Sequence, residues 1–537
     1  MNDTEKTDYE TDSTTFAGML KHIKEYKYAV IAVFLFSLLV YGSIIFYPSL
    51  SIDDEVSLTA DSVIRWMTQG RFGISVLDFF VTLNTGRYVP FLWEFLGVML
   101  LGISSIIGSY NMTRILNKEA KSFGVFVYCA VYLSLPFVFG ELVSFHMFAL
   151  EMGIGLFAAE MSVMMTLTFF KTAKRRALLA SLVLLVAAFS IYQALATVYI
   201  VYMVLYAYIR FTQIEKENLK AGIKDIYRKL GVGAAVTTIA AAVYFLINAL
   251  VNIIFVADSG YLIQYVGWGK QGNFLLEVFY AFANVVRILF GITIKGVIIY
   301  GGPVICFSSI VFIMVSIYFI KFAANKLHML AMAVALGIAP FTMTIILGAY
   351  ATPGRMFPGI AVFMAATWFL TVNLFNKKTL KNLILAACVC VLFLQAYYMN
   401  IIGYSKYLSY NNDVAIANNI LFEVEKLEPE YAKKPFVFIG AYEYQKNRKV
   451  IPFLIGTVHG ESFFEHDSGS NGRMVSFLNS IGHNILLPNA TQIREGLAIS
   501  ENMSLWPAKG SVVILDDCIV IKLSEPVEEW YLINGVK

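Results

Sequence analysis

The chain has 537 residues, of which 58% are hydrophobic and 15% are charged. An ordinary soluble domain has about 25% charged residues, so this composition excludes a purely soluble protein and predicts a polytopic α-helical membrane protein. The formal net charge of +4 comes from 41 basic and 37 acidic residues. So small a balance gives no reason to expect a nucleic-acid partner and leaves the lipid bilayer as the expected surroundings.

The chain begins with a polar stretch, and we expect residues 1–27 to form a cytosolic tail. A transmembrane helix needs about 20 apolar residues to cross the hydrocarbon. By this rule we predict about eleven transmembrane helices, two of them short, within a transmembrane domain over residues 28–400. They lie near 28–48, 91–109, 122–140, 151–170, 177–191, 193–210, 230–256, 297–320, 327–349, 359–375 and 382–400.

Basic residues indicate how these helices are oriented, because Lys and Arg favour the cytosolic side of a membrane. With the N-terminus inside, the cytosolic connections hold 22 basic residues and the external ones hold seven. This asymmetry predicts that the loop over residues 49–90 and the C-terminal region both lie outside the cytoplasmic membrane.

The external loop 49–90 opens with three consecutive acidic residues, in "SIDDE" at 51–55. One interpretation is structural, because acidic residues stabilise the first turn of a helix. The other is catalytic. Arginines follow in the same loop, and a carboxylate beside guanidinium groups suits transfer from a lipid phosphate. The acid accepts the proton of the acceptor hydroxyl and the cations hold the departing phosphate.

Three short motifs in this order resemble a known family: "SIDDE" at 51–55, "WMTQGRFG" at 66–73 and "SIYQA" at 190–194. An acidic pair directly after the first span resembles the GT-C class of membrane glycosyltransferases. The three motifs together resemble the bacterial O-antigen-type glucosyltransferases. The resemblance implies a GT-C-like transmembrane domain and a polyprenyl-phosphate hexose, usually glucose, as donor. It also implies transfer to a cell-surface polysaccharide or a lipid-linked glycan on the outer face of the inner membrane.

On this interpretation Asp53 or Asp54 is the general base, with Asp54 slightly favoured because it lies further from the end of the span. Glu55 is expected to begin a helix or to contact the sugar. Arg71 follows Gly70, a residue that allows the backbone to approach a ligand closely.

Arg71 is therefore a candidate ligand of the donor phosphate, and the alternative is a charge that faces solvent or lipid headgroups. Arg355, in "GAYATPGRMFPG", is a second candidate, since prolines on both sides hold it on a rigid mount. Arg87, in "NTGRYVPF", is a third, although a basic residue there could also be a snorkelling interfacial side chain.

Other polar residues are expected on the external side. His146, with Glu141 and Glu151 on either side of it in the chain, could contribute to an acceptor site or be a structural histidine. Tyr192 and Gln193 begin a span and could hydrogen-bond a sugar, or Gln193 could cap a helix. A divalent cation at the acidic pair stays open, because two adjacent carboxylates alone do not complete a metal site.

After residue 400 the sequence becomes mixed and polar, with β-like stretches "PFVFIGAYE" at 435–443 and "SVVILDDCIVIKL" at 511–523. Residues 401–537 are therefore expected to form a small extracytoplasmic domain of the α/β or α+β class.

Two other functions fit the same membrane layout. A lipid-linked sugar transporter or flippase would need a similar number of spans, but such proteins commonly carry paired repeats and ionisable residues near the middle of the membrane. A polysaccharide polymerase or ligase would use a similar lipid-linked donor and transfer an oligosaccharide. Most external charges of this chain gather at one face instead, which favours the transferase over the transporter. The sequence alone does not separate the transferase of a single hexose from the polymerase or ligase.

Overall fold

The structure is a computed structural model, and it is mainly helical. It describes residues 16–47, 49–59, 64–81, 88–255, 265–270, 272–293, 298–348, 353–375, 377–444 and 461–536.

The helices of the first half are α2 (Phe16–Glu25), α3 (Lys27–Phe46), α4 (Asp54–Thr59), α5 (Ile64–Thr68), α6 (Phe72–Val81), α7 (Leu92–Leu116), α8 (Ser122–Leu133), α9 (Pro136–Leu142), α10 (Ala149–Thr172), α11 (Arg175–Ile191), α12 (Ala196–Thr212) and α13 (Leu219–Phe255). Those of the second half are α15 (Phe274–Leu289), α16 (Gly302–Phe322), α17 (Lys326–Ile338), α18 (Thr342–Leu347), α19 (Pro358–Leu374), α20 (Lys378–Leu427), α21 (Asn471–Ser480), α22 (Ala490–Ser500) and α23 (Glu528–Ile533).

Eight helical segments among the described residues are long and apolar enough to cross a membrane. A ninth exists if α8 and α9, which meet at a bend of 56°, are one broken span. The prediction of a polytopic membrane protein is confirmed at this level, whereas the number eleven is not. Two of the predicted spans coincide with α11 and α19, which have 17 residues each and fall short of the usual length.

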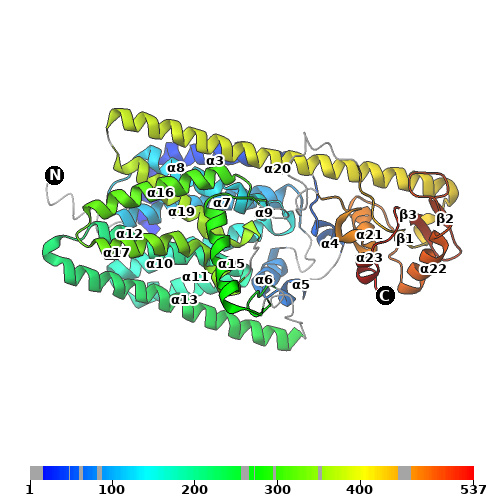
Figure 1. Ribbon diagram of the computed structural model, residues 1–537, viewed down its shortest axis with the longest axis horizontal. Helices are drawn as coiled ribbons and strands as arrows, with labels where there is room; N and C mark the ends of the chain where they lie inside the picture. The colour runs from blue at the N-terminus through cyan, green and yellow to red at the C-terminus, as the bar shows by residue number, and fades with distance from the viewer. Residues whose placement is uncertain are drawn as a thin grey trace.

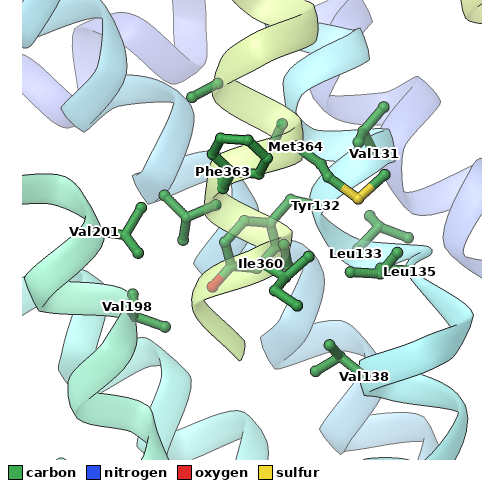
Figure 2. Packing of buried hydrophobic residues seen from close by; sticks show 14 of the residues in the cluster. Val131, Tyr132, Leu133, Leu135, Val138, Val198, Val201, Ile360, Phe363 and Met364 are labelled. Carbon is green, nitrogen blue, oxygen red and sulfur yellow. The ribbon is translucent and has the colours of Figure 1, made fainter. Parts of the chain in front are cut away.

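The membrane helices pack around a continuous apolar core. Figure 2 shows part of it, where side chains of α8, α12 and α19 such as Tyr132, Val201 and Phe363 meet between the helices. All three of these side chains are almost completely buried. Since lipid tails are as apolar as these residues, close packing is what holds such helices together in a bilayer.

Helix α20 joins the membrane region to the C-terminal region. It is 50 residues long, which corresponds to about 75 Å, whereas the hydrocarbon is only about 30 Å thick. Figure 1 shows α20 running along the whole bundle and continuing beside the C-terminal elements. The change of character expected at residue 400 therefore falls inside a helix that ends at Leu427.

The C-terminal region contains a small mixed sheet with helices on both faces. Its strands are β1 (Phe436–Ile439), β2 (Val512–Ile514) and β3 (Ile519–Lys522), in the order β1-β3-β2, with β1 parallel and β2 antiparallel to β3. Phe436 and Phe438 pack towards α20 and α21, whereas Val437 and Ile439 pack towards α22 and α23. This alternation is what a period of two residues requires of a strand buried on both faces.

Candidate active site

The acidic stretch lies where the helical bundle meets the C-terminal region. Helix α4, which begins at Asp54, occupies this junction in Figure 1, and α21 of the C-terminal region packs directly against it. The short helices α5 and α6 of the same loop lie at the same end of the bundle. Residues that are far apart in the sequence are therefore brought to one place.

Asp53 is the accessible member of the three acids. Its side chain is 47% exposed, and its backbone has a φ of 81°, a left-handed conformation that residues other than glycine rarely adopt. Its Oδ1 atom accepts hydrogen bonds from Nη1 and Nη2 of Arg473, at 3.2 Å each. Within the described residues Oδ2 has no hydrogen-bond partner. A strained, half-exposed carboxylate with one oxygen available is a feature often found at functional sites.

Asp54, by contrast, is completely buried and holds two segments of backbone. Oδ2 accepts a hydrogen bond from the backbone N–H of Ser51 at 2.7 Å, and Oδ1 accepts one from that of Met147 at 3.0 Å. Burial raises the pKa of this carboxyl group, and the two amide donors and neighbouring cations oppose the shift. The geometry favours a structural role for Asp54 and leaves Asp53 as the acid that a substrate can reach.

Glu55 is also buried, with its side chain fully inaccessible. One carboxylate oxygen pairs with Nη1 of Arg473. Burial raises the pKa of Glu55 to about 7, because the loss of solvent outweighs the attraction of the guanidinium. A carboxyl group with no exposed surface does not fit the expected contact with a sugar, and its position in the first turn of α4 fits a helix-start acid.

His146 lies in a buried cluster of charged groups beneath Asp54. Its Nδ1 atom is 3.0 Å from a carboxylate oxygen of Glu94 and 3.8 Å from one of Asp54. Its Nε2 atom is 2.6 Å from Nζ of Lys406, a residue of α20. His146 therefore links three helices and is 2% exposed, which favours the structural interpretation.

The segment 144–148, which includes His146, connects several parts of the site through its backbone. The carbonyl of Ser144 accepts hydrogen bonds from Ser51 and Lys406, and the N–H of Met147 binds Asp54. The rings of Phe145 and Phe148 stack on each other with centroids 5.4 Å apart. Each of these two rings also contacts one of the predicted phosphate-binding arginines, Phe148 with Arg71 and Phe145 with Arg355.

Arg71 packs among aromatic rings. Its guanidinium lies 5.0 Å from the ring of Tyr192 and 5.8 Å from those of Trp66 and Phe148, and Nε has no hydrogen-bond partner among the described residues. Such contacts involve the flat face of the guanidinium, so the N–H groups at its edge can still bind an anion. Although the residue as a whole is 9% exposed, the interpretation as a ligand of phosphate fits this geometry.

Tyr192 and Gln193, which the sequence analysis expects near the sugar, lie beside the turn that contains Arg71. The side-chain amide of Gln193 donates to the carbonyls of Gln69 and Gly70, and the hydroxyl of Tyr244 also donates to Gly70. Tyr192 meanwhile contributes its ring to Arg71. The structure therefore brings both residues to Arg71: Tyr192 contacts its guanidinium, and Gln193 holds the backbone just before it.

Arg355 lies against the other of the two stacked rings, that of Phe145. Its guanidinium is 5.4 Å from the ring of Phe145, and Nη1 forms an ion pair with Glu141. The other carboxylate oxygen of Glu141 accepts the backbone N–H of Arg355 at 3.0 Å. Glu141 thus holds both the backbone and the side chain of Arg355. Arg87 lies outside the described residues.

Two further predicted features concern acids and metals. Glu151 is buried, and its Oε1 atom accepts a hydrogen bond from the indole N–H of Trp93 at 3.0 Å, whereas Oε2 has no hydrogen-bond partner among the described residues. In the part of the chain that the structure describes, no group of three or more His, Cys, Asp or Glu side chains has the geometry to hold a metal ion. The cation beside Asp53 and Glu55 is the guanidinium of Arg473.

Sequence reasoning missed Arg473, Lys406 and Glu94. All three come from segments with no recognisable motif, and Arg473 is separated from Asp53 by 420 positions. The signal that could have found Lys406 is its place six residues, or nearly two helical turns, beyond the predicted end of the last span at residue 400. A basic residue among apolar ones at that position needs a buried partner.

The structure is a helical bundle of the membrane type, with a half-exposed carboxylate and two arginines at one end. A comparison with protein families matches residues 42–407, about two thirds of the chain, to the model for the glucosyl transferase GtrII family. The chain belongs to this family, and it is a glycosyltransferase by that membership. The predicted family resemblance is confirmed. No curated protein and no solved structure gave a significant match.

Proposed function

We propose that this protein transfers one hexose, glucose, from a polyprenyl-phosphate donor to a cell-surface polysaccharide or glycolipid on the outer face of the cytoplasmic membrane. The observation that carries the proposal is the position of Asp53. Its carboxylate is half exposed at the end of the bundle. The next residue, Asp54, binds the backbone of the 144–148 segment, whose two phenyl rings contact Arg71 and Arg355.

The chemistry assigned to these residues is a single displacement. The acceptor hydroxyl oxygen attacks the anomeric carbon while its proton passes to Oδ2 of Asp53. The bond between that carbon and the phosphate oxygen breaks, and its electron pair leaves with the polyprenyl phosphate. Arg71 and Arg355 stabilise the charge on the departing phosphate. Attack on the face opposite the leaving group inverts the anomeric configuration.

A lipid-linked donor suits the location of the two arginines. Each guanidinium lies against a phenyl ring, which provides an apolar surface next to the charge. A polyprenyl phosphate combines the same two features, an apolar chain and an anionic head. The excess of basic residues in the opposite connections supports an external position for this end of the bundle.

The test is donor use by the purified full-length protein. With polyprenyl-phosphate glucose in mixed micelles and a glycan acceptor, we expect transfer of one glucose per acceptor end. With UDP-glucose alone, in detergent free of polyprenol lipids, we expect none. Equal transfer from the nucleotide sugar would overturn the proposed donor. Products that grow by whole oligosaccharide units would favour the polymerase or ligase instead.

A further inference from the structure

The guanidinium of Arg473 contacts three carboxylates at once. Its outer nitrogens bind Oδ1 of Asp53 and one oxygen of Glu55, and its Nε donates to Asp467 at 3.0 Å. Asp467 belongs to the C-terminal region, as Arg473 does. It therefore holds the guanidinium from within that region, whereas Asp53 and Glu55 belong to the external loop. The planar fork of arginine can serve these partners together in a fixed direction, which a lysine cannot.

The mount of Arg473 is rigid. It lies in the first turn of α21, whose N-cap residue Ser470 accepts a hydrogen bond from the N–H of Arg473. Further along α21, the ring of Phe477 stacks on that of Phe463 with centroids 4.3 Å apart. The side chain of Arg473 is 14% exposed. Because the guanidinium is held in place, it also restricts the orientation of the Asp53 carboxylate that it binds.

We propose that Arg473 is a positioning residue of the active site, which orients Asp53 through Oδ1 and leaves Oδ2 for the acceptor hydroxyl. This inference rests on the proposed function, because it takes Asp53 as the base. Arg473 lies 66 positions beyond residue 407, where the match to the family model ends. The C-terminal region therefore completes a site whose other parts lie within the matched range.

The charges around Arg473 determine what its removal does. Asp53, Glu55 and Asp467 contact it directly, and His466 contacts Asp467. Asp54 also acts on Glu55, and Arg65 of α5 is a further cation that acts on all three acids of the stretch. Without the guanidinium, three carboxylates would be left close together. Mutual repulsion and the loss of an opposite charge both favour protonation, so the cluster would take up protons at a higher pH.

The experiment compares pH profiles of glucose transfer in the full-length protein for Arg473→Gln, Arg473→Lys and the matched control Arg494→Gln. Arg494 is exposed on α22 and lies outside the site. Rates are expressed per folded molecule. For Arg473→Gln we expect the acidic limb of the profile to move up by about one to three pH units. For Arg473→Lys we expect the limb to stay in place and kcat to fall about tenfold with KM for the donor unchanged.

A merely structural role would give a different result. Arg473→Gln would then lower the rate by the same factor at every pH, and that outcome would overturn the inference. Normal kcat in Arg473→Lys would overturn it too, and this second variant decides the matter if the first does not fold. Repeating the comparison in a His466→Gln background removes the titration of the neighbouring imidazole, and the shift should persist.

Asp53→Asn in the same assay separates this inference from the proposed function. If Asp53→Asn is active, the proposed base is wrong. If Asp53→Asn is inactive and the profile of Arg473→Gln is unmoved, only the role of Arg473 is wrong.

Discussion

Replacing Asp54 with Asn is expected to destabilise the protein, although the change is nearly isosteric. The carboxylate uses one oxygen for the N–H of Ser51 and the other for the N–H of Met147. An amide has only one oxygen, so one of these buried N–H groups must face an NH₂ group. A buried donor left without an acceptor costs about 1–3 kcal/mol. The free energy of unfolding should fall by that amount, less whatever is regained by burying an amide in place of a charge.

Asp53→Asn is the matched control for this experiment. Asp53 is half exposed, and an ion pair of that kind contributes about 0–1 kcal/mol. Thermal unfolding of both variants in one detergent should therefore show a clear loss for Asp54→Asn and little or none for Asp53→Asn. The reasoning would be refuted if Asp54→Asn were as stable as the unmodified protein, or if Asp53→Asn were the less stable of the two.

Three other predictions concern donor binding, pH dependence and topology. Arg355→Lys and Glu141→Gln should each raise KM for the lipid donor about tenfold, or about 1.4 kcal/mol, because Glu141 holds Arg355 in place; a normal KM in Glu141→Gln would contradict this. Burial raises the pKa of Glu55 from 4.5 to about 7, so its contribution to stability is present below pH 4.5 and lost as the pH rises through about 7. Unfolding measurements should show this loss in the unmodified protein and a flatter curve in Glu55→Gln, and identical curves would count against it. Reporters fused after Phe375 should read cytosolic and those after Leu427 external, and an internal reading after Leu427 would separate the C-terminal region from the proposed active face.

Much of the helical framework could be predicted from the sequence, because apolar runs of about 20 residues carry a strong local signal. Both β-like stretches also became strands, β1 within residues 435–443 and β2 with β3 within 511–523. The extension of α20 to Leu427 could not be predicted in the same way. Its second half buries polar residues such as Ser409 and Asp413, so it does not have the apolar pattern of a span.

The candidate site was predictable only in its local parts. "SIDDE" and "WMTQGRFG" indicated where a carboxylate and an arginine would lie, but they could not show which acid is exposed. That difference depends on contacts over long separations, with Met147 binding Asp54 and Arg473 binding Asp53. The packing of α4 against α21 and against the turn at His146–Phe148 sets these two pairings, which leave no periodic signal in the sequence. The sequence favours Asp54 as the base for its distance from the span, whereas its complete burial and the exposure of Asp53 favour Asp53.

The most direct test of the central claim is the rate of glucose transfer from polyprenyl-phosphate glucose by Asp53→Asn, measured beside the unmodified protein at equal amounts of folded enzyme. An amide cannot accept the proton of the acceptor hydroxyl, so we predict a rate about 10²- to 10⁴-fold lower with donor binding retained. A rate within a few fold of that of the unmodified protein would contradict the assignment of Asp53 as the general base.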